Sequence, residues 1–145
     1  MVELISGSPD ETSAAGKQIA KHLGSGSVVA LQGTLGSGKT CLTKGIALGL
    51  GIKENITSPT YTIINEYPIP SGKADTLYHI DVYRLNSEKE FDDLGGQEII
   101  NSNGISVIEW SERISGLLPD NTIMVLLEIT EVSLRRILIQ GLDKL

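Results

Sequence analysis

The sequence predicts an α/β fold with one domain over residues 1–145, in which helices flank a central mixed β-sheet that includes a C-terminal β-hairpin. The first observation behind this prediction is an apolar run at residues 28–31 that leads through a glycine-rich segment into a helical pattern. The second is a pair of β-rich runs at residues 122–129 and 134–139, which a short polar turn joins. The third is composition, because 40% hydrophobic and 21% charged residues in a chain of 145 suit one globular domain with its own core.

The sequence of the N-terminal half predicts a helix, a strand and a second helix, in that order. A capping box opens a helix over residues 8–24, and apolar residues recur at every fourth position within it. Residues 27–32 predict a strand, whose unbroken apolar character is typical of a parallel sheet covered on both faces. A second four-residue apolar stripe predicts a helix over residues 41–50.

The second half predicts further strands with short helices between them. Strands at residues 62–67 and 76–83 are expected to pair across a turn that contains proline and glycine. A polar, acidic helix follows at residues 86–94, and residues 97–100 form a short helix or a turn. Residues 105–110 predict a second apolar strand, which ends on acidic and aromatic side chains.

The segment between the first apolar strand and the second helix fits the pattern G-x-x-x-x-G-K-[ST]. Its members are Gly33, Thr34, Leu35, Gly36, Ser37, Gly38, Lys39 and Thr40. Glycines let backbone N–H groups turn inward around phosphate oxygens, and the helix N-terminus adds its positive dipole end. We expect Lys39 to reach the β- and γ-phosphates and the Thr40 hydroxyl to bind Mg²⁺. The sequence therefore predicts a P-loop NTPase-like domain.

Phosphate chemistry also needs an acidic group near Mg²⁺ and a group that orients the attacking water. Glu109 closes an apolar strand, which places its carboxylate at the carboxyl edge of the sheet beside the loop. Asp81 lies inside a β-rich stretch, where an aspartate is out of place unless it is paired or coordinating. By pattern alone, a solvated strand end remains open for Glu109 and an exposed edge strand for Asp81.

Four further side chains have structural interpretations. Trp110, the only tryptophan, is interpreted as a packing residue, with stacking on a base as the alternative. Cys41 is interpreted as a small helix residue, since no second thiol or evident base accompanies it. His22 and His79 have no metal-ligand partners at suitable spacing, so both are interpreted as structural.

The guanine-recognition pattern Asn-Lys-x-Asp is absent from the sequence, which favours ATP as the nucleotide over GTP.

Charge and cysteine content restrict the partners and the compartment. Twelve basic residues are scattered among eighteen acidic ones, for a net charge of −6, so independent nucleic-acid binding is disfavoured. An acidic chain can still join an assembly whose other subunits hold RNA. One cysteine permits no internal disulfide, and no apolar run has the length of a membrane span. These observations predict a cytoplasmic protein with no membrane partner.

Five segments, in order along nearly the whole chain, carry a more specific signal. They are Asp10-Glu11-Thr12, the loop at 33–40, Thr57-Ser58-Pro59-Thr60-Tyr61, His79-Ile80-Asp81-Val82-Tyr83-Arg84-Leu85 and Ile108-Glu109-Trp110-Ser111-Glu112. Together they resemble the bacterial TsaE (YjeE) family of ATPases, which serve the assembly that adds threonylcarbamoyl to adenosine in certain tRNAs. Family members often carry an acidic residue where Thr34 stands and a second threonine where Cys41 stands, and neither is a fixed loop position.

The resemblance implies roles for these residues. Lys39 and the loop amides would hold ATP phosphates, Thr40 and Glu109 would surround Mg²⁺, and Asp81 would act in catalysis or on Mg²⁺-bound water. The implied nucleotide contacts are Thr12, Gly33, Thr34, Leu35, Gly36, Ser37, Gly38, Lys39, Thr40, Cys41 and Trp110. The implied switch loop, which would sense the γ-phosphate, is Thr57, Ser58, Pro59, Thr60 and Tyr61.

The resemblance also implies two protein partners, TsaD and TsaB, with ATP hydrolysis resetting their complex between rounds and tRNA contacted only indirectly. Two other functions compete with this one. A small-molecule kinase shares the loop, but it usually needs an arginine-bearing lid, and none of the four arginines lies between Gly95 and Ile108. A nucleotide-gated binding module with negligible turnover needs the same loop and metal residues, so sequence alone does not separate it from a slow ATPase.

Overall fold

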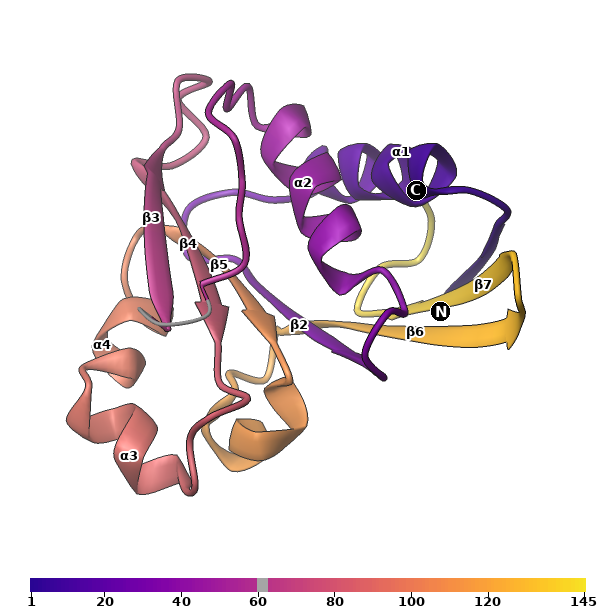
Figure 1. The fold of residues 1–145 in the computed structure, drawn as a ribbon. Coiled ribbons are helices and arrows are strands. Elements are labelled where there is room, and N and C mark those ends of the chain that lie inside the picture. Colours follow the sequence, from indigo (N-terminus) through magenta and orange to yellow (C-terminus); the bar gives the residue numbers. More distant parts are fainter. Residues whose placement is uncertain (60–62) are drawn as a thin grey trace.

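A computed structural model describes residues 1–59 and 63–145, and over those residues the chain forms one seven-stranded mixed sheet (Figure 1). In sheet order, the strands are β1 (Val2–Ser6), β7 (Leu134–Gln140), β6 (Ile123–Glu131), β2 (Val28–Gly33), β5 (Ile105–Glu109), β4 (Thr76–Asp81) and β3 (Ile64–Pro68). The four strands from β6 to β4 run parallel, and antiparallel strands continue the sheet on both sides. The prediction of an α/β fold with a mixed sheet and a C-terminal hairpin is confirmed.

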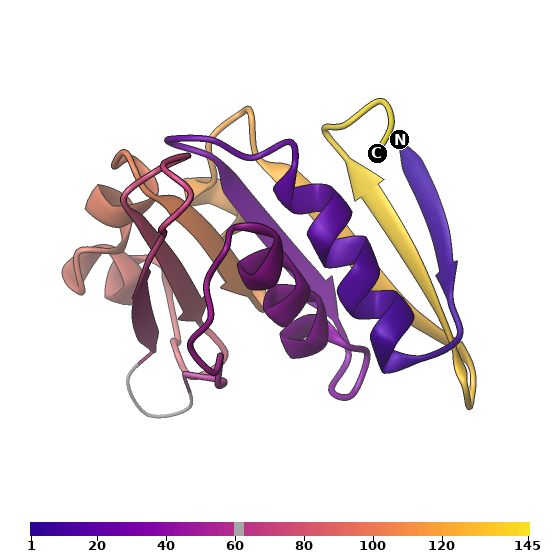
Figure 2. The same ribbon diagram turned by 90° about the horizontal axis from the view of Figure 1, so that it is seen from above.

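Helices cover the sheet on both faces, as Figures 1 and 2 show from two sides. The helices α1 (Pro9–Ala20) and α2 (Lys39–Gly49) lie on one face. The helices α3 (Glu88–Asp93) and α4 (Gly96–Ile100) and the 3₁₀ helix η1 (Ser111–Leu117) contribute to the core of the other face. Alternate residues of β2 enter the two cores: Val29 packs beneath α1 and α2, and Val28 packs with Phe91 of α3.

Several element boundaries differ from expectation, and one strand was missed. The first helix ends at Ala20 rather than at residue 24, and β4 ends at Asp81 rather than at residue 83. The strand β1 was not predicted, because its short sequence alternates between partly exposed and exposed positions and its pairing partner β7 lies at the far end of the chain. The Ser8 cap is confirmed, since its hydroxyl accepts a hydrogen bond from the backbone N–H of Glu11 at 3.1 Å. The Glu11 carboxylate completes the motif differently from the predicted capping box, because it accepts from the N–H of Gly7 at 3.1 Å.

The helices α1 and α2 approach each other at backbone distance. A Cβ atom added to Gly45 of α2 would lie 2.0 Å from the carbonyl oxygen of Ser13 in α1. One added to Gly16 of α1 would lie 2.3 Å from the carbonyl oxygen of Leu42 in α2. Only glycine permits this contact, which fixes α2 and the loop before it against the first turns of α1.

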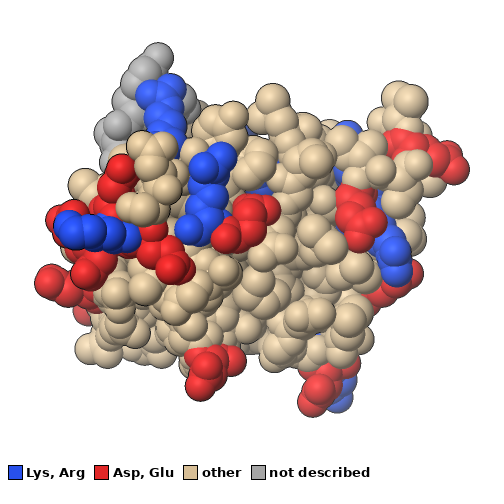
Figure 3. All heavy atoms as spheres, turned by 90° about the horizontal axis from the view of Figure 1, so that it is seen from below, with Lys and Arg blue, Asp and Glu red and all other residues tan. Residues whose placement is uncertain are grey.

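Charged side chains of both signs are interspersed on the face seen in Figure 3, where Lys and Arg form no continuous basic surface. None of the helices in the described part of the chain has both the length and the apolar character that crossing a membrane requires.

Candidate functional site

The glycine-rich loop leaves β2 at the carboxyl edge of the parallel strands and enters α2 at Lys39. Gly36 and Gly38 have φ values of +81° and +109°, a left-handed conformation that side-chain-bearing residues rarely adopt. Such alternation turns successive backbone N–H groups toward one point, where an anion can lie. The Ser37 hydroxyl is fully buried and has no hydrogen-bond partner among the described residues.

The Lys39 side chain folds back over the loop. Its ammonium group donates to the carbonyl oxygens of Gly33 at 2.6 Å and Thr34 at 3.1 Å, and it lies 4.0 Å from the ring centroid of Trp110. Burial lowers the pKa of this ammonium, and the nearby Glu109 carboxylate acts in the opposite direction. An ammonium has three N–H donors. Two bind the loop carbonyls, and the third can bind a phosphate oxygen.

The first acidic candidate, Glu109, lies directly beside the loop. It ends β5, and its register partner in the parallel strand β2 is Leu31, two residues before Gly33. Glu109 is 3% exposed, and the Thr40 hydroxyl lies 3.4 Å from both of its carboxylate oxygens. A hydroxyl and a carboxylate at this spacing form the kind of oxygen pair that holds Mg²⁺ together with phosphate oxygens and water. The residues therefore fit the metal that the sequence predicts.

Glu109 has a second partner that sequence reasoning missed. The Nε2 atom of His79 lies 2.5 Å from Oε2 of Glu109, and both side chains are buried. The two residues come from β4 and β5, which are parallel neighbours, so their closeness depends on strand pairing and not on sequence spacing. The interpretation of His79 as structural therefore omitted its contact with the predicted metal ligand.

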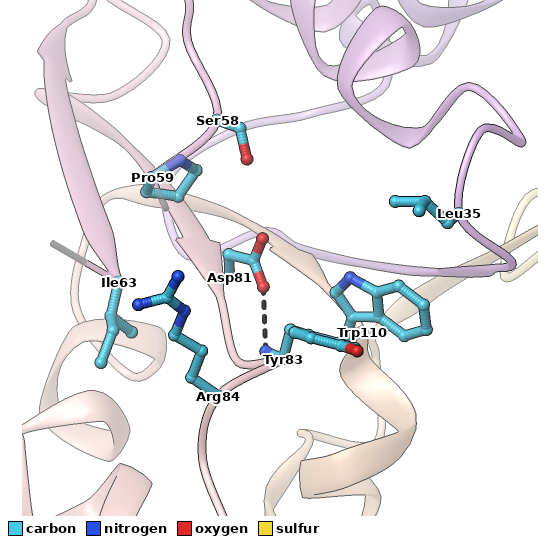
Figure 4. Close-up of a pocket in the computed structure, with 8 residues that line it drawn as sticks. All are labelled: Leu35, Ser58, Pro59, Ile63, Asp81, Tyr83, Arg84 and Trp110. Carbon is cyan, nitrogen blue, oxygen red and sulfur yellow. Dashed lines mark hydrogen bonds between the residues drawn. The ribbon is translucent and has the colours of Figure 1, made fainter. Parts of the chain in front are cut away.

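Asp81 ends β4 and is the register partner of Glu109. Its Oδ1 atom accepts a hydrogen bond from the backbone N–H of Tyr83 at 2.9 Å (Figure 4). Burial raises the pKa of the Asp81 carboxyl; the Tyr83 N–H acts against that shift, and the Glu109 carboxylate adds to it. The structure thus brings both predicted carboxylates to the same sheet edge as the loop.

Trp110 turns the chain sharply just after Glu109. Its φ of 61° is left-handed, a conformation that costs a non-glycine residue about 1 kcal/mol or more. The turn places the indole beside the Tyr83 ring, with centroids 4.8 Å apart, and over the Lys39 ammonium. The next residue, Ser111, is buried and donates its hydroxyl to the carbonyl oxygen of Leu31 at 3.1 Å. A hydrogen bond to β2 therefore supports the turn.

Two adjoining cavities meet at the loop. One of about 270 Å³ contains Lys39, Thr40, Asp81 and Glu109; its complete lining is Leu35, Gly36, Gly38, Lys39, Thr40, Cys41, Ser58, Asp81, Glu109 and Trp110. We call it the phosphate cavity. It brings together residues from four segments of the chain, which the sequence had associated only through motifs.

The second cavity, of about 260 Å³, lies on the other side of the loop and contains Thr12. The Ser6 and Thr12 hydroxyl oxygens lie 2.6 Å apart, so β1 helps to position Thr12. Arg135 also lines this cavity and donates to the Gly36 carbonyl oxygen at 3.3 Å, a contact across 99 positions that the sequence did not indicate. Cys41 lines both cavities; burial raises the pKa of its thiol, which donates to the Pro9 carbonyl oxygen.

A third, more apolar pocket of about 330 Å³ opens next to the phosphate cavity (Figure 4). Ser58 and Pro59 face Asp81 across it, with Leu35 and Trp110 on the side of the loop. These two switch-loop residues therefore lie beside the predicted site. Thr57 is exposed and outside the linings of the three cavities. Thr60 and Tyr61 lie outside the described residues.

The fold and the site together define the class of protein. It is an α/β domain with a mixed sheet, in which a glycine-rich loop of the phosphate-binding type leads into a helix and carboxylates stand at the ends of neighbouring strands. The family model of "Threonylcarbamoyl adenosine biosynthesis protein TsaE" matches residues 6–137. The chain belongs to the TsaE family.

Individual relatives agree with this assignment. The chain is 48% identical over 125 residues to a tRNA threonylcarbamoyladenosine biosynthesis protein TsaE from Treponema pallidum, covering 86% of this chain and 90% of the relative. It is 42% identical over 120 residues to the TsaE of Bacillus subtilis, covering 83% and 73%. A crystal structure of YdiB from Bacillus subtilis superposes with a TM-score of 0.74 at 33% identity, covering 94% of this chain and 82% of that one.

Proposed function

We propose that this protein is a cytoplasmic, Mg²⁺-dependent ATPase of slow turnover that is required for threonylcarbamoyladenosine modification of tRNA. The observation that carries the proposal is the convergence of Lys39, Thr40 and Glu109 in one cavity at the head of α2. The names of the relatives connect the family to this modification. The partners in this proposal are TsaD and TsaB, with tRNA contacted only through their complex. The net charge of −6 is consistent with tRNA being held elsewhere.

Each residue has a distinct part in this proposal. The loop amides and Lys39 bind the β- and γ-phosphates, and the cavity around Thr12 takes the nucleoside end. Thr40 and Glu109 hold Mg²⁺, which when bound neutralises charge that develops on the phosphates. Asp81 orients the attacking water or binds it in the metal's hydration shell. Hydrolysis then resets the TsaD–TsaB complex between cycles.

A second candidate is a nucleotide-gated binding module with negligible turnover. The exposed apolar side chains beside the cavity suit it as well as they suit the ATPase with its partners: Leu35 is 86% exposed and Tyr83 is 52% exposed. Such side chains suit contact with a protein partner. In this alternative, bound ATP would order the surface around Ser58 and Pro59, and hydrolysis would be unnecessary.

One experiment separates the two candidates. ATP hydrolysis is measured with the purified protein alone and then with TsaD and TsaB, while complex formation is followed with ATP and with a non-hydrolysable analogue. Strong stimulation by the partners supports the ATPase. Tight binding without hydrolysis in both conditions, and equal complex formation with both nucleotides, supports the gated module.

A further inference from the structure

We infer that His79 is a positioning residue that fixes the Glu109 carboxylate toward Thr40, so that the metal-binding oxygens are arranged before the ligand arrives. This inference rests on the proposed function, because it concerns the same Mg²⁺ site. His79 is fully buried at the centre of β4, and its partner Glu109 ends the adjacent strand β5. Both residues follow the apolar alternation of the sheet face beneath α2, on which Leu77 and Val107 also lie.

The two contacts of the Glu109 carboxylate differ in strength. The Thr40 hydroxyl lies 3.4 Å from each oxygen, beyond the usual range of 2.5–3.0 Å for an O–H···O hydrogen bond. The His79 contact at 2.5 Å is much shorter and engages only Oε2. The His79 contact therefore fixes Oε2 and with it the rotation of the carboxylate, while the Thr40 hydroxyl lies equally far from both oxygens.

The second ring nitrogen of His79, Nδ1, indicates which residue donates the hydrogen bond between His79 and Glu109. The Nδ1 atom of His79 is buried and has no hydrogen-bond partner within the described chain. A buried N–H without an acceptor is destabilising, so the favoured tautomer carries its proton on Nε2. His79 thus donates to Glu109, which leaves the carboxylate as an oxygen ligand for a cation. A purely structural role for His79 needs no donor at this position.

Two substitutions test the donor separately from the packing. His79→Gln keeps an N–H donor at about the reach of Nε2, whereas His79→Leu keeps side-chain volume and removes the donor. Mg²⁺ is titrated into each variant bound to ADP, with the fluorescence of Trp110, the chain's only tryptophan, as the signal. Affinity for ADP in EDTA and thermal unfolding in EDTA are measured in parallel. His22→Leu, at an exposed position just beyond the C-terminus of α1, is the matched control.

We expect His79→Leu to weaken Mg²⁺ binding about tenfold, because groups that orient metal ligands typically contribute 10- to 100-fold to metal affinity. ADP affinity in EDTA should change less than about twofold, since the loop contacts are intact. His79→Gln should recover most of the Mg²⁺ affinity, and His22→Leu should match the parent. If His79→Leu does not fold, His79→Asn replaces it, because the shorter amide does not reach Glu109 and the same loss is expected.

Three results would overturn the inference. They are unchanged Mg²⁺ affinity in folded His79→Leu, equal losses of ADP affinity with and without Mg²⁺, and a His79→Gln variant as deficient as His79→Leu. The outcomes for the proposed function are different. A parent protein that binds ADP without any Mg²⁺ dependence contradicts both proposals. A parent that binds Mg²⁺ and ADP but never hydrolyses ATP contradicts only the ATPase, and the His79 comparison still decides the positioning role.

Discussion

The two sides of the phosphate cavity are built differently. On the closed side, Lys39, Glu109 and His79 are almost fully buried and hold one another or the loop through hydrogen bonds. On the open side, Leu35 and Tyr83 are mostly exposed and come from connections between the regular elements. Strand ends and a helix head keep the closed side in place before any ligand binds, which is what electrostatic stabilisation of phosphate requires. The open side leaves room for a partner to complete the site.

The largest effect is expected from removing the central cation of the closed side. Lys39→Ala should weaken ATP and ADP binding by about 100-fold, because charge-assisted hydrogen bonds to phosphate contribute on the order of 3 kcal/mol. Isothermal titration gives the affinity, and circular dichroism checks the fold. Lys44→Ala, exposed on the same helix, is the control and should bind normally. Near-parental affinity in Lys39→Ala would show that the loop is not part of the nucleotide-binding site.

A more selective change on the closed side is Glu109→Gln, which keeps an acceptor for His79 while removing the charge that holds Mg²⁺. Hydrolysis in the presence of the partners should fall by about 100-fold, and nucleotide binding should fall by less than about tenfold. Phosphate release under single-turnover conditions measures the first quantity. Glu112→Gln, in the same sequence motif, should retain activity. Unchanged turnover in Glu109→Gln would rule out the metal role of Glu109.

Asp81 lies between the closed and the open side, since it lines both the phosphate cavity and the adjoining pocket. Asp81→Asn in the nucleotide-free protein tests how this carboxylate affects folding stability. Burial raises the pKa of Asp81 above its ordinary value of 3.8, so the folded chain binds this proton more tightly than the unfolded chain does. Ionisation therefore costs folding stability, which declines as pH rises through the window just above 3.8. The variant should be more stable than the parent at pH 7, and the difference should shrink toward pH 4.

Urea unfolding at several pH values measures this difference. The Asn side chain can still accept the hydrogen bond from the Tyr83 N–H, so that contact does not confuse the comparison. A stability difference that is the same at pH 4 and pH 7 would show that desolvation of Asp81 is not its cause.

The smallest effect on the isolated protein is expected on the open side. Leu35→Ser should change nucleotide affinity less than about twofold and unfolding free energy by less than about 0.5 kcal/mol, because Leu35 is 86% exposed. Hydrolysis stimulated by TsaD and TsaB should nevertheless fall several-fold. Leu48→Ser, an exposed leucine on α2, serves as the control. Full stimulation of Leu35→Ser would exclude this side chain from the partner contact.

Local patterns predicted much of the fold and of the closed side. Hydrophobic periodicity located β2, α2 and β5, and the loop motif located Lys39 and Thr40, because each of these signals lies within a short stretch of chain. The end of an apolar strand indicated Glu109 as a candidate beside the loop while a solvated position stayed open, and the structure places it there.

Contacts across strands could not be predicted in this way. His79 meets Glu109 only because β4 and β5 pair in one particular register, and Arg135 reaches Gly36 from the other end of the chain. The edge strand β1 is as long as β5, but Glu3 interrupts its apolar residues, so it does not stand out before its pairing with β7 is known. Each omission concerns a contact that depends on the sheet order, and no local pattern encodes that order.

Under the proposed function, the close approach of α1 and α2 would restrict which nucleosides the site accepts. Thr12 lies on α1 and Thr40 on α2, and backbone contact at Gly16 and Gly45 sets the separation of the two helices. Side-chain rotamers therefore cannot widen the gap, and a larger base would require the displacement of an entire helix. Any adaptation to a different base would have to come from the opposite wall, which Val132 and Ser133 between β6 and β7 and Arg135 of β7 line.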